Sequence, residues 1–288
     1  MEFRTKVQIP RSAVKIAPCQ RMLFVGSCFA DSIGRRFQDE QFRATVNPYG
    51  VMYNPASVLH TIERWTQSGD TLSPGTGDAD RLFAVITLGT NHVYREKSTG
   101  EIVDNCQKRP QNLFSEEVLS VEECHEYLRQ AVETLRKATA DRLKVIVTVS
   151  PIRYRKYGYH ESQLSKAVLL LAADRLTKEY PQWVDYFPAY ELMNDELRDY
   201  RFYQPDMLHP SQQAVEYIYE RFAETYFAEA TDIFLKAWRP LREALGHRPF
   251  NPESADYKAF RRATMEKIEA LRQQYPDMAT GEIPPTKE

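Results

Sequence analysis

The chain has 288 residues, 42% of them hydrophobic, which is enough to build the core of one large α/β domain or of two small ones. The formal net charge is −2 with acidic and basic residues mixed throughout, so we expect no nucleic-acid partner. The first residues contain no basic stretch followed by an apolar run, and no later segment approaches the ~20 apolar residues that span a bilayer. We therefore expect a cytoplasmic protein with no membrane partner.

The four cysteines, Cys19, Cys28, Cys106 and Cys124, show neither close pairing nor the spacing of metal ligands. This pattern predicts reduced thiols in a reducing compartment. It also predicts no metal site, and no residue pattern calls for a cofactor.

Apolar, β-rich runs alternate with amphipathic helical segments, a pattern typical of parallel strands joined by crossover helices. Asn54 before Pro55 is expected to begin one helix, and Ser120 with Glu123 forms a capping box for another. Two further helices are predicted, at about 161–179 and 210–228. The predicted strands are 22–25, 42–46, 82–88, 143–149 and 183–187.

From about Thr231 the pattern becomes helical only. We therefore divide the chain into a domain at 1–230 and a helical extension at 231–288 packed on it. Phe234, Trp238 and Phe250 are expected to make that packing.

In an open parallel sheet, ligands bind at the carboxyl ends of the strands. Each predicted strand is followed by a segment of unusual composition, so we expect one site at this edge. The five segments are "GSC" at 26–28, "NPYG" at 47–50, "GTNH" at 89–92, "SPIRYRKYGYH" at 150–160 and "PDMLHPS" at 205–211.

Asp206 and His209 lie three residues apart at the start of a predicted helix. The carboxylate can accept the Nδ1 proton of the imidazole, which leaves Nε2 free to take a proton from a nucleophile. In the alternative, Asp206 caps the helix and His209 packs under it.

These motifs, in this order, resemble those of the SGNH, or GDSL-type, hydrolases. The segments "GSCFADSIG", "NPYGVMYNP", "VDNCQK", "VSPI", "DMLHPS" and "HRPFNPES" are more closely similar to the GSCFA family. Together with the place of Asp206 and His209 at the expected site, the resemblance favours the catalytic role of this pair. It also implies a three-layer α/β fold. Its five-stranded parallel sheet, in the order 2-1-3-4-5, would have helices on both faces and be followed by the helical extension.

Aligned without a gap on the SGNH Gly-Asp-Ser turn, Gly26 matches the glycine and Cys28 falls on the nucleophile. A cysteine at a helix N-terminus beside an imidazole readily becomes a thiolate, so we favour Cys28. Ser27, activated by His209, is the alternative nucleophile. In a third interpretation, both side chains merely fit a tight turn.

Acyl transfer needs hydrogen-bond donors for the oxyanion. The resemblance implies three: the N–H of Cys28, Gly50 and Asn91. Substrate contacts are expected from Gly89, His92, Arg153, Tyr154 and Lys108. In the alternative interpretations, the segment 150–160 is a solvated loop and His92 is a residue of the pocket wall. Asn105 and Cys106 receive no role, and their spacing from Cys28 does not favour a redox pair.

The resemblance, together with these residues, implies an ester hydrolase or acyltransferase that forms a covalent acyl-enzyme. The expected partner is a small polar or carbohydrate-linked ester. The rival hypothesis is a binding or scaffold protein that kept the pocket and lost the reaction, because fold does not fix function. The sequence predicts no oligomeric state.

Overall fold

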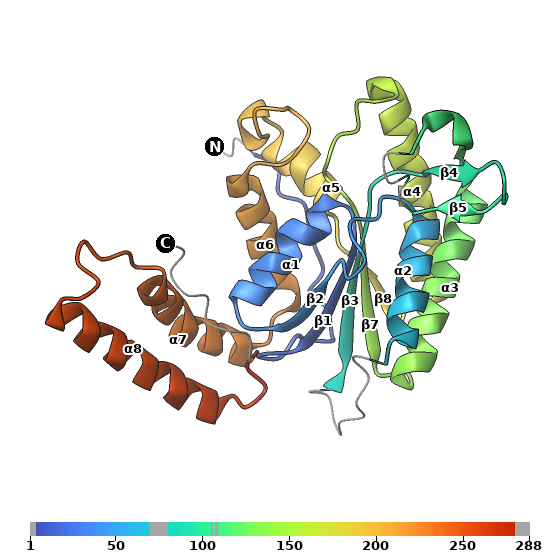
Figure 1. Ribbon diagram of the computed structural model, residues 1–288. Helices are drawn as coiled ribbons and strands as arrows, with labels where there is room; N and C mark the ends of the chain where they lie inside the picture. The colour runs from blue at the N-terminus through green and yellow to red at the C-terminus, as the bar shows by residue number, and fades with distance from the viewer. Residues whose placement is uncertain (1–3, 70–79, 105, 107–108, 280–288) are drawn as a thin grey trace.

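The computed structural model describes residues 4–69, 80–104, 106 and 109–279. Its centre is a five-stranded sheet in which every neighbouring pair is parallel (Figure 1). In spatial order the strands are β2 (Arg43–Val46), β1 (Arg21–Gly26), β3 (Leu82–Leu88), β7 (Leu143–Val149) and β8 (Val184–Tyr186). Counted among these five strands alone, the order is 2-1-3-4-5, so the predicted topology is confirmed.

Helices cover both faces of the sheet, which gives the three predicted layers (Figure 1). One face carries α2 (Pro55–Gln67), α3 (Val121–Thr139) and α4 (Gly158–Glu179), and the other carries α1 (Cys28–Asp39), α6 (Gln212–Tyr226) and α7 (Glu229–Leu245). Successive residues of a strand point to opposite faces. Thus Leu23 of β1 packs with the first group and Phe24 with the second.

The helix starts follow from local capping. The Asn54 side chain accepts a hydrogen bond from the Ser57 N–H at 2.9 Å, with Pro55 in the first turn of α2. Ser120 and Glu123 form both hydrogen bonds of the capping box that begins α3. Both predicted caps are confirmed, because each depends only on residues within one turn.

A small antiparallel sheet follows β3 at the upper edge of the central sheet (Figure 1). Its strands are β4 (His92–Glu96), β5 (Ile102–Val103) and β6 (Phe114–Val118). The remaining short elements are η2 (Gln111–Leu113), α5 (Ala189–Glu191), the π-helical η3 (Leu192–Leu197) and η4 (Tyr200–Phe202).

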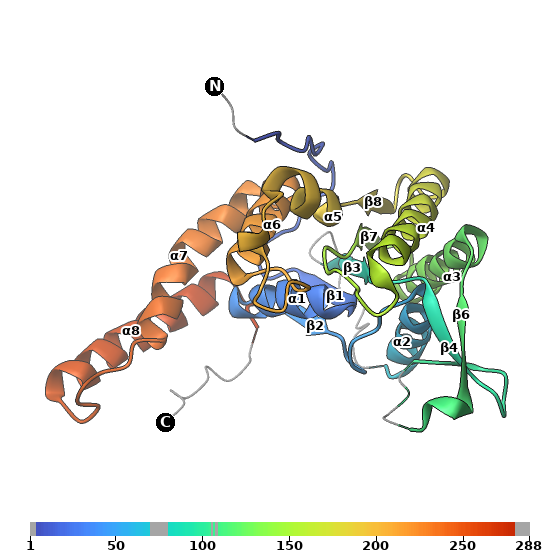
Figure 2. The ribbon, with the colours of Figure 1, turned by 90° about the horizontal axis from the view of Figure 1, so that it is seen from above.

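The C-terminal helices join the core of the central sheet through α7. Phe234 and Trp238 are buried in the same cluster as Phe24, and the Trp238 indole donates to the Asp39 carbonyl at 2.7 Å. The prediction that Phe250 packs on the domain is wrong, because this side chain is fully exposed. It lies in the turn before α8 (Ala255–Gln274), which packs along α7 and extends away from the sheet (Figure 2).

A buried ion cluster reinforces this junction. Glu40, which is 0% exposed, lies just after α1 and pairs with Arg36 at 3.0 Å. From α7, Arg239 and Arg242 each approach the same carboxylate oxygen at 3.2 Å. A buried carboxylate of this kind is tolerated only while its cations stay in place.

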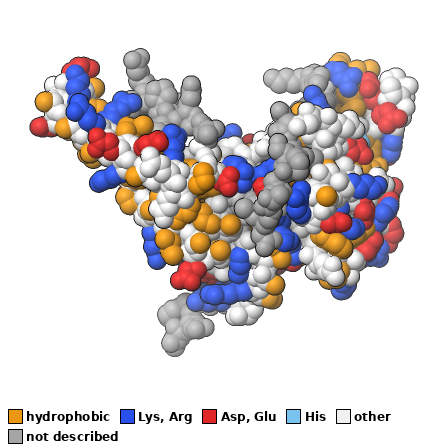
Figure 3. Space-filling model, turned by 90° about the horizontal axis from the view of Figure 1, so that it is seen from below, with side chains coloured by type: hydrophobic (Ala, Val, Ile, Leu, Met, Phe, Trp, Pro, Cys, Tyr) orange, Lys and Arg blue, Asp and Glu red, His pale blue; other side chains and the backbone are white. Residues whose placement is uncertain are grey.

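On the lower face of the molecule, basic and acidic side chains are interspersed (Figure 3). Within the described ranges, no helix is both long enough and apolar enough to cross a bilayer.

Trp238→Ala should lower the free energy of unfolding by about 3–5 kcal/mol, because it empties a filled site between α7 and the sheet. Phe250→Ala, which removes an exposed aromatic ring, should change it by less than about 0.5 kcal/mol. Urea denaturation of both variants measures the difference. Equal stabilities would show that α7 is not part of the domain's core.

Candidate active site

The turn after β1 is held against the neighbouring strand β3. Gly26 has φ +138°, and a Cβ atom there would lie 2.1 Å from the Thr87 carbonyl oxygen. The next N–H, that of Ser27, donates to the Thr87 carbonyl at 3.1 Å and to the Thr87 hydroxyl at 2.9 Å. Only glycine permits this approach. The start of α1 is thereby fixed at the carboxyl edge of the sheet.

The Ser27 side chain is enclosed in the turn. It is 1% exposed, its hydroxyl lies 2.9 Å from the Thr87 hydroxyl, and it accepts a hydrogen bond from the Phe29 N–H at 3.2 Å. Ser27 is thus the N-cap of α1.

Cys28, the first residue of α1, is partly exposed. Its Sγ lies 3.5 Å from the Tyr53 hydroxyl oxygen. Its N–H has no acceptor among the described residues, as is usual in a first helical turn. The positive end of the helix dipole and this free N–H both favour negative charge beside the thiol.

Tyr53 joins the segment after β2 to the segment after β3. Its backbone carbonyl accepts hydrogen bonds from the N–H groups of Gly89 at 2.8 Å and Thr90 at 2.9 Å. A Cβ atom at Gly89 would lie 3.0 Å from that carbonyl oxygen, which accounts for the glycine. Burial, followed by the hydrogen bond to the Cys28 thiol, raises the pKa of Tyr53, so its hydroxyl stays protonated at neutral pH.

Asp206 and His209 form the predicted pair. Asp206 accepts the N–H of Leu208 at 2.8 Å and of His209 at 3.0 Å, and its second oxygen lies 2.6 Å from His209 Nδ1. The Leu208 N–H, followed by the His209 side chain, lowers the pKa of Asp206 to about 2. Within the described residues, the His209 ring forms no hydrogen bond to Cys28.

Arg153 holds the His209 loop at the carboxyl end of β7. Its backbone N–H donates to the Leu208 carbonyl at 3.0 Å, and its guanidinium donates to the Met207 carbonyl at 3.1 Å. The same guanidinium lies over the rings of Tyr159 and Tyr203, at 4.3 and 5.5 Å. These contacts hold the Arg153 side chain between the His209 loop and the two rings.

Two residues that the sequence suggested as oxyanion donors are engaged elsewhere. The Gly50 N–H donates to the Asn47 carbonyl at 2.9 Å, in a turn where Gly50 has φ +95°. Asn91 is 1% exposed, and its side-chain amide donates to the Leu119 carbonyl at 2.7 Å. Of the three suggested donors, only the Cys28 N–H is unoccupied.

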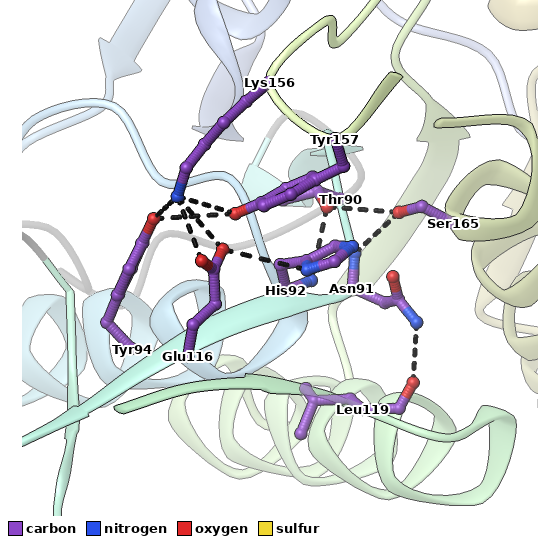
Figure 4. A network of polar contacts seen from close by, with 9 residues as sticks. All are labelled: Thr90, Asn91, His92, Tyr94, Glu116, Leu119, Lys156, Tyr157 and Ser165. Atoms are coloured by element: carbon purple, nitrogen blue, oxygen red, sulfur yellow. Dashed lines mark hydrogen bonds and ion pairs between the residues drawn. The ribbon is translucent and has the colours of Figure 1, made fainter. Parts of the chain in front are cut away.

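His92 belongs to a polar network between β4, β6 and the loop before α4 (Figure 4). Its ring stacks on Tyr157, with centroids 3.9 Å apart, and burial lowers its pKa, so it is neutral at neutral pH. Lys156 binds Glu116 at 3.0 Å and contacts the Tyr94 hydroxyl. This network ties the loop after β7 to the small sheet.

Tyr154 lies in the same loop and is half-buried, 5.3 Å from Tyr157 between ring centroids. Cys106 is partly buried, and burial raises the pKa of its thiol. Asn105 and Lys108 lie outside the described residues.

A buried lysine lies at the carboxyl edge of the sheet. Lys166 of α4 is 3% exposed, and its Nζ donates to the carbonyls of Gly89 at 2.7 Å and Ser150 at 2.9 Å. Burial lowers its pKa to about 7. The Lys166 side chain thus links the ends of β3 and β7. In the described part of the chain, no three His, Cys, Asp or Glu side chains gather as metal ligands would.

The sequence interpretation gave no role to Tyr53, Thr87 or Lys166. Tyr53 lies inside the motif "NPYGVMYNP", and this position is the one feature of the sequence that could have marked Tyr53 as a site residue. Nothing local in the sequence marks Thr87 as the partner of Ser27, or Lys166 as buried.

The family model described as "GSCFA family" matches residues 21–74 and 76–222, more than half of the chain. The chain belongs to the GSCFA family. A second model, "GSCFA domain protein, C-terminal domain", matches residues 238–282. A comparison with curated proteins gave no match.

Two solved structures similar to this GSCFA protein were compared with it. A member of the lipolytic G-D-S-L family from Veillonella parvula has 12% identity and a TM-score of 0.47, covering 72% of this chain and 98% of that one. A putative acylhydrolase from Bacteroides fragilis has 14% identity and a TM-score of 0.45, covering 75% and 88%.

Ser27→Ala should lower the free energy of unfolding by about 1–3 kcal/mol, because it removes the cap of α1 and leaves a buried Thr87 hydroxyl short of a partner. Ser32→Ala, which removes an exposed hydroxyl further along α1, is the control. Urea denaturation checks both. An unchanged free energy of unfolding in Ser27→Ala would show that the hydroxyl does not hold the turn.

Lys166 should make stability depend on pH. Its pKa is about 7 when folded and near 10.5 when unfolded, so only the unfolded chain holds the proton between these values. The wild type should therefore gain stability relative to Lys166→Met as pH rises from about 7 to 10, and the difference should be constant below that range. Urea midpoints at a series of pH values test this, and parallel curves would contradict it.

Proposed function

We propose that this protein is an ester hydrolase or acyltransferase that works through a thioester on Cys28. One observation carries the proposal: of the two adjacent candidate nucleophiles, the Cys28 thiol is partly exposed at the N-terminus of α1, whereas the Ser27 hydroxyl is enclosed and acts as the cap. A partly exposed thiol at the start of a helix can be reached by a substrate and can act as a nucleophile.

In the proposed reaction, the Cys28 thiolate attacks the ester carbonyl carbon. A sulfur–carbon bond forms, and the π electrons of the carbonyl move onto oxygen to give an oxyanion. When the carbonyl re-forms, the bond to the alcohol oxygen breaks and the leaving alcohol takes a proton from His209. Water or another acceptor then gives its proton to His209 and attacks the thioester, which releases the thiolate.

Asp206 is proposed to orient His209. The short contact to Nδ1 fixes the tautomer and leaves Nε2 for proton transfer. The hydrogen bonds from Arg153 support this role because they hold the loop beside the carboxyl end of β7. His209 Nε2 must approach Cys28 when substrate is bound, since catalytic hydrogen bonds often tighten only in the complex.

The proposed substrate is a small polar or carbohydrate-linked ester. Exposed aromatic rings surround this edge, with Tyr53 45% and Tyr200 68% exposed, and such rings present flat apolar faces to a sugar. Lys156 is less available to an anionic substrate, because it is already paired with Glu116.

A binding or scaffold protein is the second candidate. Two observations favour it: His209 forms no hydrogen bond to Cys28 within the described residues, and Gly50 and Asn91 direct their donors into the protein.

Turnover of 4-nitrophenyl acetate should separate the two functions. Cys28→Ala should reduce it to the uncatalysed rate, and His209→Asn should reduce it by about 10²-fold or more. Cys106→Ser, another partly buried thiol, is the matched control and should keep wild-type turnover. If the wild type is no faster than the uncatalysed reaction, the binding function replaces the enzymatic one.

The same variants identify the nucleophile. At neutral pH, Cys28 should react with iodoacetamide faster than Cys19 and Cys124, because burial raises the pKa of each of those thiols to about 12. Peptide mapping measures the four rates. Loss of turnover in Ser27→Ala, with retention in Cys28→Ala, would assign the reaction to the hydroxyl.

A further inference from the structure

The proposed acyl transfer leaves one requirement unmet. The oxyanion formed on Cys28 needs preorganised donors, and each can be worth ~10²–10³-fold in rate. The Cys28 N–H is available, but the N–H of Gly50 and the amide of Asn91 donate to carbonyls of the protein itself. A second donor must therefore come from another residue near the thiol.

We propose that the Tyr53 hydroxyl is this second donor. It is the side-chain group that contacts the thiol, with Oη 3.5 Å from Cys28 Sγ. The inference rests on the proposed function, because it assigns a catalytic residue to the same reaction.

The geometry follows from the bonds made in the reaction. When Sγ bonds to the ester carbon, the oxyanion lies one bond beyond that carbon, in the space beside the sulfur. The Tyr53 hydroxyl already lies beside the sulfur, so it can turn its O–H from Sγ to the new oxyanion. It donates a hydrogen bond and keeps its proton. The proton for the leaving alcohol still comes from His209.

The Tyr53 hydroxyl is available for this role. Its side chain is 45% exposed, so a substrate can reach it. Burial of the ring's inner part and the neighbouring thiol both raise its pKa, which keeps the O–H as a donor through the neutral range.

The backbone around Tyr53 fixes its position relative to Cys28. The Met52 N–H donates to the Gly26 carbonyl at 2.8 Å, within two residues of the thiol. The Tyr53 carbonyl accepts two N–H groups from the end of β3, and Asn54 caps α2. Both sides of Tyr53 are thus anchored, as preorganised stabilisation requires.

Tyr53→Phe tests the inference with a change of one oxygen atom. With 4-nitrophenyl acetate, kcat should fall by about 10²–10³-fold with little change in KM, because the lost contact exists only in the transition state. The rate at which iodoacetamide alkylates Cys28 should stay within about threefold, since that reaction forms no oxyanion. Tyr49→Phe, in the same segment, removes a hydroxyl bonded to Arg64 on α2 and is the matched control.

A second measurement does not depend on turnover. Acetaldehyde adds reversibly to a thiol: the sulfur bonds to the carbonyl carbon, and the thiol proton moves to the carbonyl oxygen. This hemithioacetal places an oxygen where the oxyanion would form, so Tyr53→Phe should weaken its formation on Cys28 about tenfold or more, while Tyr49→Phe should not.

Three outcomes would overturn the inference. Unchanged kcat in Tyr53→Phe would remove the donor role. A fall in alkylation as large as the fall in kcat would make Tyr53 a partner of the thiolate instead. Wild-type turnover in Cys28→Ala would overturn the proposed function itself. Because that result comes from Cys28→Ala and not from Tyr53→Phe, the two failures can be told apart.

Discussion

The close approach of Gly26 to Thr87 is the constraint on which the site depends. The missing side chain lets β1 end directly against β3, and the Ser27 N–H then bonds to both oxygens of Thr87. These contacts leave one direction for the chain to enter α1. Cys28 consequently emerges at the carboxyl edge, with its N–H unoccupied and its thiol turned toward Tyr53. A larger residue at position 26 would separate the strands and shift Cys28.

The loops around this turn are joined to one another by hydrogen bonds to backbone carbonyls. Tyr53 binds the segment after β3, and Arg153 binds the loop of His209. Lys166 binds the carbonyls that directly follow β3 and β7. These hydrogen bonds satisfy polar groups near the edge of the sheet and hold the candidate catalytic loops in place.

The strands could be predicted because "LFAVITL" and "LKVIVTV" are apolar throughout, as buried parallel strands must be. The pairing of Asp206 with His209 was also predictable, since three residues separate them. Contacts between loops were not. Cys28 and Tyr53 are 25 residues apart in the sequence. The direction of the Asn91 amide depends on the carbonyl of Leu119, which directly follows β6. The prediction that Phe250 packs on the domain was wrong, because the sequence does not show that the turn before α8 places this side chain in solvent.

The ion cluster at Glu40 joins the two segments that the family models match separately. α1 belongs to the first segment, whereas Arg239 and Arg242 belong to the second. Trp238 of the second segment also shares a buried cluster with Phe24 of the first. The border between the two family models therefore runs through one hydrophobic core and does not separate two cores.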